Sequence, residues 1–260
     1  MNTTQKVIKT FAICLAALII LSIINGVAHL VTSAFSFNND VNINETYNSD
    51  INNIKIDVGT TNMVIKYGDT FSITAENVSK EFKIKEEGKT LVIKEKSITI
   101  FGNKKSSHTT ITIPSSLNNL SIDIGAGKLE LSDITSNNFS LNQGAGKVDI
   151  TNLISNNTTI DGGAGELHIT SSKLQNLDLD LGAGKCYYNG ILLGNNKIDQ
   201  GVGDLILDLY REDYTIKASK GLGSITINGE SYSKDVTVGE GINDIKIDGG
   251  IGSIIINTNK

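Results

Sequence analysis

From residue 120 onward, hydrophobic and polar residues alternate in a pattern that repeats every 19 residues. Within each repeat, apolar side chains occupy every second position on both sides of a Gly-x-Gly sequence, and a period of two is typical of β-strands. Each repeat is therefore expected to form a strand, a sharp corner and a second strand. The five repeats of equal length span 120–138, 139–157, 158–176, 177–195 and 196–214.

The repeats align in register, so equivalent side chains are expected to stack on one another. A fixed period near 20 residues is typical of a solenoid, in which each unit buries its apolar face against its neighbours. We therefore predict an all-β fold, a single-stranded parallel β-helix whose rungs of about 19 residues lie about 4.8 Å apart. Its inward columns are predicted to be Ile122, Leu141, Ile160, Leu179 and Ile198 before the corner, and Leu129, Val148, Leu167, Cys186 and Leu205 after it.

The two ends of a repeat carry different corner signatures. Gly-Ala-Gly at 125–127 and its copies in later repeats permit positive φ angles and close stacking of backbones. At the other end, an asparagine recurs in four consecutive repeats, which predicts a ladder of side-chain amides hydrogen-bonded from rung to rung. This ladder is predicted to contain Asn138, Asn157, Asn176 and Asn195.

Less regular segments flank the five repeats. A sixth unit at 215–234 is one residue longer, and a degenerate tail follows it with glycines near 241–243 and 250–252. We expect the sixth unit to continue the stack, and the upstream segments to form its first turns and cap, which gives one domain over 51–260. The upstream segments that alternate in the same way, with turn signals between them, are 52–76, 82–96 and 108–117.

The N-terminal part of the chain is continuously apolar instead of alternating. Residues 11–30 carry no formal charge, and about 20 residues at 1.5 Å per residue span a hydrocarbon core of about 30 Å. Lys6 and Lys9 precede this run and acidic residues follow it, so the positive-inside rule predicts a cytoplasmic N-terminus. We predict a single transmembrane helix or signal anchor at 10–33 that holds the protein in the cell membrane.

The organisation of the chain follows from this segment. Residues 1–9 are predicted to be cytoplasmic, and the polar, Asn-rich residues 34–50 are predicted to form a tether. A cleaved signal peptide is the alternative, because the apolar stretch is short enough and Thr32-Ser33-Ala34 offers small residues for cleavage. Both arrangements place the β-helix on the extracytoplasmic side of the membrane.

The charge and composition of the chain exclude several classes of function. The net charge is −5 and Arg211 is the only arginine, which argues against nucleic acid and other polyanions as partners. A content of 26 Gly, 1 Pro and no Trp agrees with strands joined by polar turns. Cys14 lies in the apolar run and Cys186 in the β-rich part, so both are predicted to be free thiols, with Cys186 buried and unreactive.

One outward column of the predicted rungs combines acidic, basic and aromatic residues. A carboxylate, a histidine and a tyrosine are suited to acid–base catalysis or to metal binding. The alternative is a solvated face on which opposite charges alternate, and we favour it because no nucleophile is placed there and a metal needs three or four convergent ligands. The column consists of Glu130, Asp149, His168 and Tyr187, with Lys128, Lys147, Glu166 and Lys185 two residues earlier.

A second outward column is acidic. Three stacked carboxylates repel one another unless a cation or a proton relieves them, and calcium prefers oxygen ligands. The nine-residue Gly-Gly-x-Gly-x-Asp repeat of calcium-binding β-rolls is missing, however, because Leu167 stands where its Asp is required. A solvated acidic stripe is the favoured interpretation, and calcium binding is the alternative. The column consists of Asp161, Asp180 and Asp199.

The remaining chemical patterns have structural interpretations. Gly-x-Gly recurs in every rung with no helix behind it, so it predicts corners and not a phosphate-binding site. Polysaccharide-lyase chemistry requires basic residues in a cleft beside calcium, which a chain with a single arginine does not supply. We therefore predict a protein that is not an enzyme, with no catalytic, cofactor-binding or metal-binding residues and no cofactor.

Several segments together carry a resemblance to a known family. They are IKIDVGTTNMVIK (54–66), TLVIKEK (90–96), ITIPSSL (111–117), LSIDIGAG (120–127), the repeated Gly-Ala-Gly corner and Gly241-Ile242-Asn243. With these segments the chain resembles the bacterial putative-adhesin domain family, a β-strand-repeat domain of unknown function related to head-GIN type adhesins. The resemblance covers about residues 50–260. It implies a right-handed β-helix on the outer side of a cell envelope, often tethered by one N-terminal helix, without catalytic residues.

Three hypotheses about function follow. In the first, a non-enzymatic envelope protein uses its β-helix to bind a surface polymer, another cell's surface or a membrane protein. In the second, which the resemblance also implies, a regulatory or sensory ectodomain reports envelope stress to a neighbouring membrane protein. The third, a calcium-dependent glycan enzyme, requires the acidic column to bind calcium.

Overall fold

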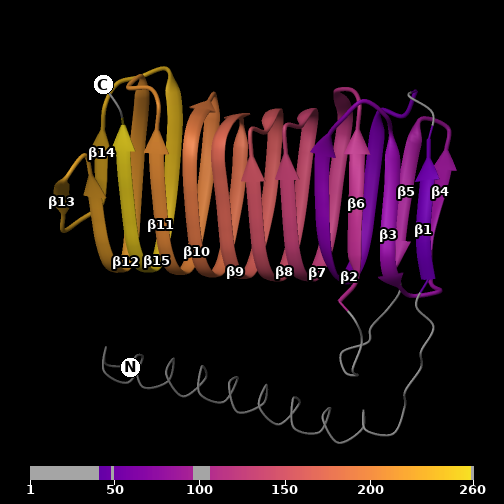
Figure 1. Ribbon diagram of the computed structural model, residues 1–260. Coiled ribbons are helices and arrows are strands. Elements are labelled where there is room, and N and C mark those ends of the chain that lie inside the picture. Colours follow the sequence, from indigo (N-terminus) through magenta and orange to yellow (C-terminus); the bar gives the residue numbers. More distant parts are fainter. Residues whose placement is uncertain (1–40, 48–49, 96–105, 259–260) are drawn as a thin grey trace, which may run out of the picture. The chain divides into compact units, whose positions relative to one another are not determined.

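The computed structural model describes residues 41–47, 50–95 and 106–258 (Figure 1). The chain forms two compact units, and the described residues all belong to the unit that comprises Asp40–Ser97 and Ser106–Lys260. This unit is all-β, with 15 strands joined in one sheet. The predicted transmembrane segment at 10–33 lies outside the described residues, among which no helix is long and apolar enough to cross a membrane.

The strands follow one another closely along the chain. They are β1 Val41–Thr46, β2 Asn53–Tyr67, β3 Ser72–Val78, β4 Phe82–Glu87, β5 Thr90–Glu95, β6 His108–Ile113, β7 Leu117–Ser132, β8 Thr135–Thr151, β9 Ile154–Gln175, β10 Leu177–Leu193, β11 Asn195–Leu209, β12 Tyr214–Ile227, β13 Glu230–Tyr232, β14 Val236–Val238 and β15 Asn243–Thr258. The longest of them contain the predicted Gly-x-Gly corners, so the strands continue through these corners without interruption.

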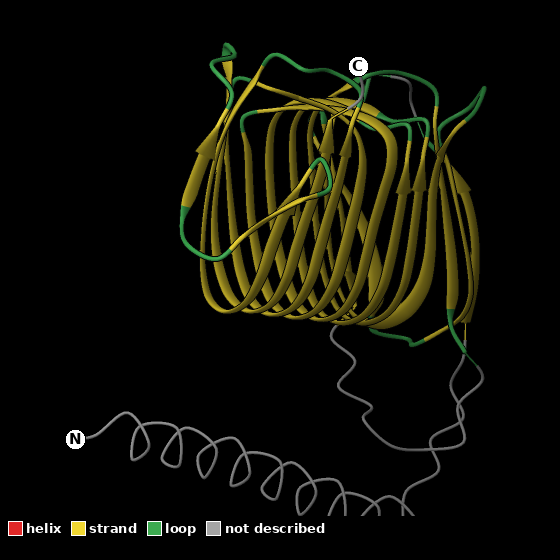
Figure 2. Ribbon diagram, turned by 90° about the vertical axis from the view of Figure 1, so that its left-hand side faces the viewer, coloured by secondary structure: helices red, strands yellow, loops and turns green. Residues whose placement is uncertain are grey.

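The strands β7 to β11 form the regular rungs, and their predicted register is confirmed. Each pairs in parallel with the next at an offset of 19 residues, so that Leu141 lies between Ile122 and Ile160. In every rung a first arm leads to the Gly-x-Gly corner and a second arm leads away from it. We call the edge formed by these corners the corner edge, and the edge formed by the turns between rungs the loop edge. Figure 2 shows the strands bending along the lower, corner edge and the loops along the upper, loop edge.

The hydrophobic core fills the space between the two arms. Both predicted inward columns are buried, as at Ile160 of the first arm and Leu167 of the second. Because each rung buries aliphatic side chains against the same positions of its neighbours, the hydrophobic effect stabilises the stack along its length. Further buried residues, which the sequence analysis did not identify, close the rungs at the loop edge: Ile134, Leu153, Leu174 and Leu192.

The second glycine of each corner is required by the spacing of the rungs. At Gly165 the φ angle is +144°, and a Cβ atom there would lie 1.9 Å from the carbonyl oxygen of Gly146 in the preceding rung. Adjacent backbones therefore approach too closely for a side chain at this position. The same close approach, with a positive φ, recurs at Gly127, Gly146, Gly184, Gly203, Gly223 and Gly252.

The order of the last rungs differs from their order along the chain. β15 lies between β11 and β12, because Ile247 pairs with Ile198 on one side and with Ala218 on the other. The expectation that the sixth unit simply continues the stack after the fifth is therefore wrong. After β12 the chain folds back over the outer edge of this strand as β13 and β14, which pair with it in antiparallel orientation. The strands β13 and β14 therefore occupy the outer edge of β12. The last rung along the chain, β15, pairs with the inner edge of β12.

At the N-terminal end of the stack, the order of the strands in the sheet also differs from their order along the chain. β2 pairs with β7 on one side, while on its other side β5 pairs with its first arm and β6 with its second arm. Three antiparallel pairings lie further out: β4 pairs with β5, β3 pairs with β6, and β1 pairs with β3. The upstream segments thus form the first turns and the cap of the same solenoid, as the sequence predicts.

Residues 41–46, predicted to lie in the tether, form the strand β1 instead. Ile43 packs against the hydrophobic core, and Tyr47 contacts Phe71 edge-on with the ring centroids 5.8 Å apart. The alternation of Val41 and Ile43 with polar residues is a strand pattern that the abundance of asparagine concealed. The strand covers the open edge of β3, so the part of the chain that can act as a tether ends before Val41.

Candidate functional site

The acidic, basic and aromatic residues predicted to form an outward column on the second arms do lie next to one another. Parallel pairing places Glu130 beside Asp149 and Asp149 beside His168. Lys147 Nζ lies 3.0 Å from Asp149 Oδ1, while Lys128 contacts Glu130 and also lies 3.8 Å from Asp149 Oδ2. Opposite charges therefore alternate along each rung and also meet diagonally between rungs, and these contacts offset the like charges that stack directly on one another.

His168 lies between two carboxylates at the centre of this column. Its Nδ1 atom is 3.5 Å from Asp149 Oδ1 and its Nε2 atom is 3.9 Å from Glu166 Oε2. The edge of the ring faces Tyr187 with the ring centroids 6.4 Å apart, and a hydrogen bond with Asp208 raises the pKa of Tyr187. These side chains lie in a row on an open face. Within the described ranges, no three His, Cys, Asp or Glu side chains are grouped closely enough to hold a metal ion.

The acidic column of the first arms is longer than predicted. The insertion of β15 adds Asp248 beyond Asp199, and the pairing of β2 with β7 extends the column at its other end. The sequence does contain a signal for this, because Lys-Ile-Asp occurs at 55–57, 197–199 and 246–248. In spatial order the column reads Asp57, Asp123, Asn142, Asp161, Asp180, Asp199 and Asp248.

The negative charge of this column is distributed unevenly. Lys246 Nζ donates a hydrogen bond of 2.7 Å to Asp248 Oδ2, which lowers the pKa of this carboxyl group. Lys197 forms an ion pair with Asp199. Asp161 and Asp180 have no ion-pair partner among the described residues, and both side chains are exposed. Asp57 and Asp123 also lack an ion-pair partner among the described residues, so the uncompensated charge lies on β2, β7, β9 and β10, and Asp161 and Asp180 are its members in the middle of the stack.

The predicted asparagine ladder is present and extends further upstream. Asn157 Nδ2 donates to Asn138 Oδ1 at 2.9 Å, and Asn176 Nδ2 donates to Asn157 Oδ1 at 3.4 Å. Asn195 takes part through its backbone N–H, which donates to Asn176 Oδ1 at 3.3 Å. At the other end, Asn138 Nδ2 donates to Asn119 Oδ1 at 2.8 Å. The ladder therefore fastens successive rungs to one another at the loop edge.

Replacing Asn157 with alanine is expected to lower the free energy of unfolding by about 1–2 kcal/mol, because two side-chain hydrogen bonds are lost. Denaturant unfolding followed by circular dichroism measures the change. Asn142→Ala is the matched control, since the side chain of Asn142 makes no hydrogen bond to other described residues. Equal losses in the two variants would show that the ladder contributes no stability.

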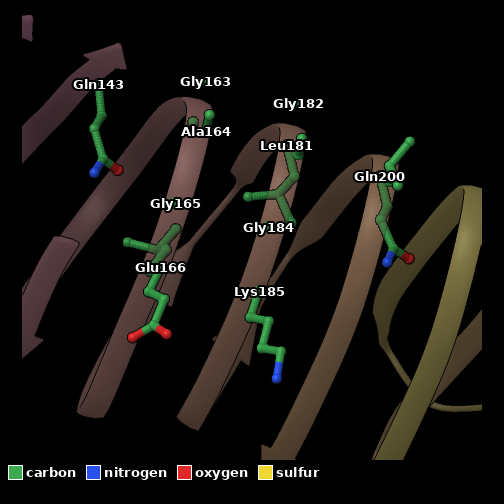
Figure 3. Close-up of a pocket in the computed structure, with 14 residues that line it drawn as sticks. Gln143, Gly163, Ala164, Gly165, Glu166, Leu181, Gly182, Gly184, Lys185 and Gln200 are labelled. Carbon is green, nitrogen blue, oxygen red and sulfur yellow. The ribbon is translucent and has the colours of Figure 1, made fainter. Parts of the chain in front are cut away.

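Two pockets among the described residues are small. One of about 20 Å³ lies at the corner edge, where Gly162 leaves a gap in an inward column. Figure 3 shows Gln143 and Leu181 on strands to either side of this gap, and Gln143 Nε2 has no hydrogen-bond partner within the described part of the chain. Another pocket, of about 190 Å³, is lined by Met63 and Thr109. Both are smaller than the pockets of about 300–1,000 Å³ that typically bind small molecules.

Cys186 occupies its predicted inward position and is a buried free thiol. Burial away from solvent raises the pKa of Cys186 to about 12, because the thiolate would be poorly solvated there. At neutral pH the side chain is therefore an apolar part of the core, and the thiolate that would react with electrophiles is absent.

The raised pKa of Cys186 predicts a loss of stability at high pH. The thiol of the unfolded chain ionises near pH 8.5, whereas the folded one stays protonated, so stability is fully present below pH 8.5 and falls by about 1.4 kcal/mol per pH unit above it. Between pH 8 and pH 10, a Cys14→Ser chain should lose about 2 kcal/mol more than the same chain with Cys186→Ala. Denaturant unfolding at both pH values measures this difference, and parallel losses would contradict the burial of the thiol.

These features define a class of protein. It is a β-solenoid with capped ends, whose outward side chains form ion-pair, carboxylate and amide ladders. The sequence of the chain matches the family model described as Toastrack DUF4097 over residues 51–247, and the chain belongs to this family. The predicted relationship to the putative-adhesin domains of unknown function is thereby confirmed.

Three bacterial proteins are among the solved structures that the chain matches. A putative adhesin from Bacteroides fragilis is 20% identical with a TM-score of 0.55, covering 83% of this chain and 97% of that chain. A putative cell adhesion protein from Clostridium sporogenes is 15% identical with a TM-score of 0.40 (85% and 100% covered). A putative lipid binding protein from Parabacteroides distasonis is 16% identical with a TM-score of 0.39 (85% and 97% covered). No curated protein matches the chain.

Proposed function

We propose that this protein is a non-enzymatic component of a cell envelope, whose solenoid binds a surface or envelope partner. The observation that carries the proposal is the extended face of the first arms, on which carboxylates recur in register from β2 to β15 with one interruption, at Asn142 of β8. A face with charged groups about every 4.8 Å suits a partner that is itself extended or repetitive. The Bacteroides fragilis structure described as a putative adhesin supports the proposal through its fold alone.

The charge pattern of this face favours a cationic partner. Asp161 and Asp180 are exposed on adjacent rungs and have no ion-pair partner among the described residues. Cationic groups of a partner would relieve the repulsion between these carboxylates, so binding would gain both attraction and relief of strain. The partner is therefore an envelope polymer or a membrane protein that presents amines, lysines or arginines at intervals of a few ångströms.

The proposal includes the location of the protein. We place residues 10–33 in the cell membrane as one transmembrane helix, with the N-terminus in the cytoplasm and a right-handed solenoid on the extracytoplasmic side. The uncharged run at 11–30 and the preceding Lys6 and Lys9 support this arrangement. A solenoid held in this way is available to partners in the envelope.

Binding can be tested with the full chain purified in detergent and immobilised. We expect it to retain whole cells or isolated wall polymer, and we expect the double variant Asp161→Asn/Asp180→Asn to retain at least about tenfold less. The control is Glu130→Gln/Asp149→Asn on the second arms, which removes an equal number of carboxylates from a face where charges are already paired.

The result also separates the proposed role from the regulatory alternative. Retention of a single membrane protein from a solubilised membrane extract, with no retention of cells or polymer, would favour a sensory ectodomain. Retention that is equal for wild type and the double variant Asp161→Asn/Asp180→Asn would show that the acidic face is not the binding surface. Absence of any retained partner would contradict the proposed function.

A further inference from the structure

A column of exposed aliphatic side chains lies on the corner edge. The residue between the two glycines of a corner pairs with its counterpart in the next rung, and in the three rungs at the C-terminal end this residue is large. Val202, Ile251 and Leu222 are 51%, 47% and 66% exposed, and we call them the aliphatic ridge. In spatial order the column reads Ala126, Ala145, Ala164, Ala183, Val202, Ile251 and Leu222.

The geometry of the corner does not explain these large residues. Alanine occupies the same position, in the same pairing register, in four rungs, so the corner does not require a larger side chain and the aliphatic residues add exposed apolar surface. The ridge is continuous only because β15 places Ile251 between Val202 and Leu222. The other large apolar residues exposed in the described part lie at the loop edge and form no such column: Tyr67, Ile154, Tyr210 and Ile242.

Charged groups beside the aliphatic ridge have polar partners within the solenoid, since Asp204 accepts a hydrogen bond from Ser253 Oγ and Lys220 donates one to a backbone carbonyl oxygen. Lys197 pairs with Asp199 and Lys246 pairs with Asp248 on the first arms of β11 and β15. By contrast, on the first arms that lead to alanine corners, Asp123, Asp161 and Asp180 have no ion-pair partner among the described residues. Apolar surface thus coincides, at one end of the corner edge, with first-arm carboxylates that are paired, and this combination is less costly to bring to an apolar interface than unpaired carboxylates are.

The chain enters the solenoid at the same edge. Following the ladder from β1 through β3 and β6 to β2, Val41 lies level with the corner of β2, and β1 runs from there towards the loop edge (Figure 1). Residues 31–40 connect this point to the uncharged run at 11–30. Ten residues span at most about 35 Å, so the proposed membrane anchor keeps this end of the corner edge near the bilayer.

We propose that the corner edge lies against the lipid surface, with the aliphatic ridge in the membrane interface at the end far from the tether. This inference rests on the proposed membrane anchor at 10–33. Seven strand spacings of about 4.8 Å separate β2 from β12, which places the ridge roughly 30 Å along the edge. A solenoid lying flat contacts lipid with Val202, Ile251 and Leu222, whereas a solenoid standing on its N-terminal cap would hold them in water.

The extent of the aliphatic ridge argues for lipid and against a second copy of the chain. Three partly exposed side chains offer roughly 300 Å², whereas a stable dimer buries about 800 Å² per partner. A lipid interface accepts an apolar strip without a complementary surface. Because the anchor already holds the chain at the membrane, a weak contact is sufficient, as in other cases of high effective concentration.

The full chain with Cys14→Ser, reconstituted in phosphatidylcholine vesicles, tests the proposal. Leu222→Cys, and separately Ile251→Cys, are labelled with the fluorophore nitrobenzoxadiazole. Ile154→Cys is the matched control, since Ile154 is exposed to a similar extent but lies at the loop edge. We expect emission at shorter wavelength, and at least about threefold stronger quenching by nitroxide-labelled lipids, at 222 and 251 than at 154. Circular dichroism confirms that each variant is folded.

The outcomes are distinct. Labels at 222 and 251 that are as exposed to water as the label at 154, in a chain that stays with the vesicles after alkaline washing, overturn the lipid contact and leave the anchor intact. Loss of the chain from the vesicles in the same wash overturns the proposed anchor itself. Shielding of the 222 label in detergent without lipid, together with fluorescence self-quenching that rises with protein concentration, identifies a second copy as the occupant and also overturns the proposal.

Discussion

Replacing Gly165 with alanine is expected to lower the free energy of unfolding by at least about 4 kcal/mol, because two effects act at once. A φ of +144° is a conformation that costs an L-residue about 1–3 kcal/mol. In addition, the new Cβ would lie 1.9 Å from the carbonyl oxygen of Gly146, so the two rungs must separate locally and lengthen their hydrogen bonds. Denaturant unfolding followed by circular dichroism measures the loss.

Gly88→Ala separates the two effects. Gly88 lies in the turn between β4 and β5 with a φ of +62°, and a Cβ atom there would meet nothing within 4 Å. This variant therefore has only the backbone cost, and we expect a loss of about 1 kcal/mol. If Gly165→Ala were no more destabilising than Gly88→Ala, the rungs would not be packed against each other at the corner edge as closely as the structure shows.

The regular part of the fold could be predicted from the sequence because its determinants are local. Alternation sets which residues face inward, the 19-residue period sets the register, and glycine marks the corner. The column of Ile122, Leu141 and Ile160 was predictable for this reason, since each rung repeats the same short-range pattern. The asparagine ladder followed from the same register, although the participation of Asn119 did not, because it lies just before the first complete repeat.

The order of the terminal rungs could not be predicted in the same way. Any rung with alternating arms and a glycine corner can stack on any other, so the position of β15 between β11 and β12 depends on which strand edges are free. The edge of β12 is occupied by β13 and β14, short strands whose pairing is not visible as a periodicity. Residues 41–46 present the same difficulty, since β1 exists only because β3 leaves an edge for it to cover.

The candidate binding surfaces could be predicted only in part, because they also depend on the order of the terminal rungs. Asp161, Asp180 and Asp199 were identified from adjacent repeats, but Asp248 joins them only through the position of β15. The aliphatic ridge is an even clearer case, because Ile251 is the residue that connects Val202 with Leu222. Ladder interactions between side chains depend on which rungs are neighbours, and the sequence order of rungs does not determine this at the ends of the stack.

The position of β15 leads to a second large expected effect, at Ile256. This side chain is fully buried between Leu207 of β11 and Ile227 of β12. Ile256→Asp would place a carboxylate in the core without a partner, and we expect a loss of at least about 4 kcal/mol, since a buried charge of this kind is among the most destabilising changes known. Chemical unfolding, or the failure of the C-terminal rungs to resist proteolysis, measures the effect.

The neighbouring residue gives a matched control. Ile255 lies on the same strand with its side chain on the outer, partly exposed face, so Ile255→Asp introduces the same group one residue away and is expected to cost less than about 1 kcal/mol. If β15 instead followed β12 as the last rung, Ile256 would be covered on one side only. The carboxylate introduced by Ile256→Asp could then reach solvent, and losses of similar size for the two variants would contradict the inner position of β15.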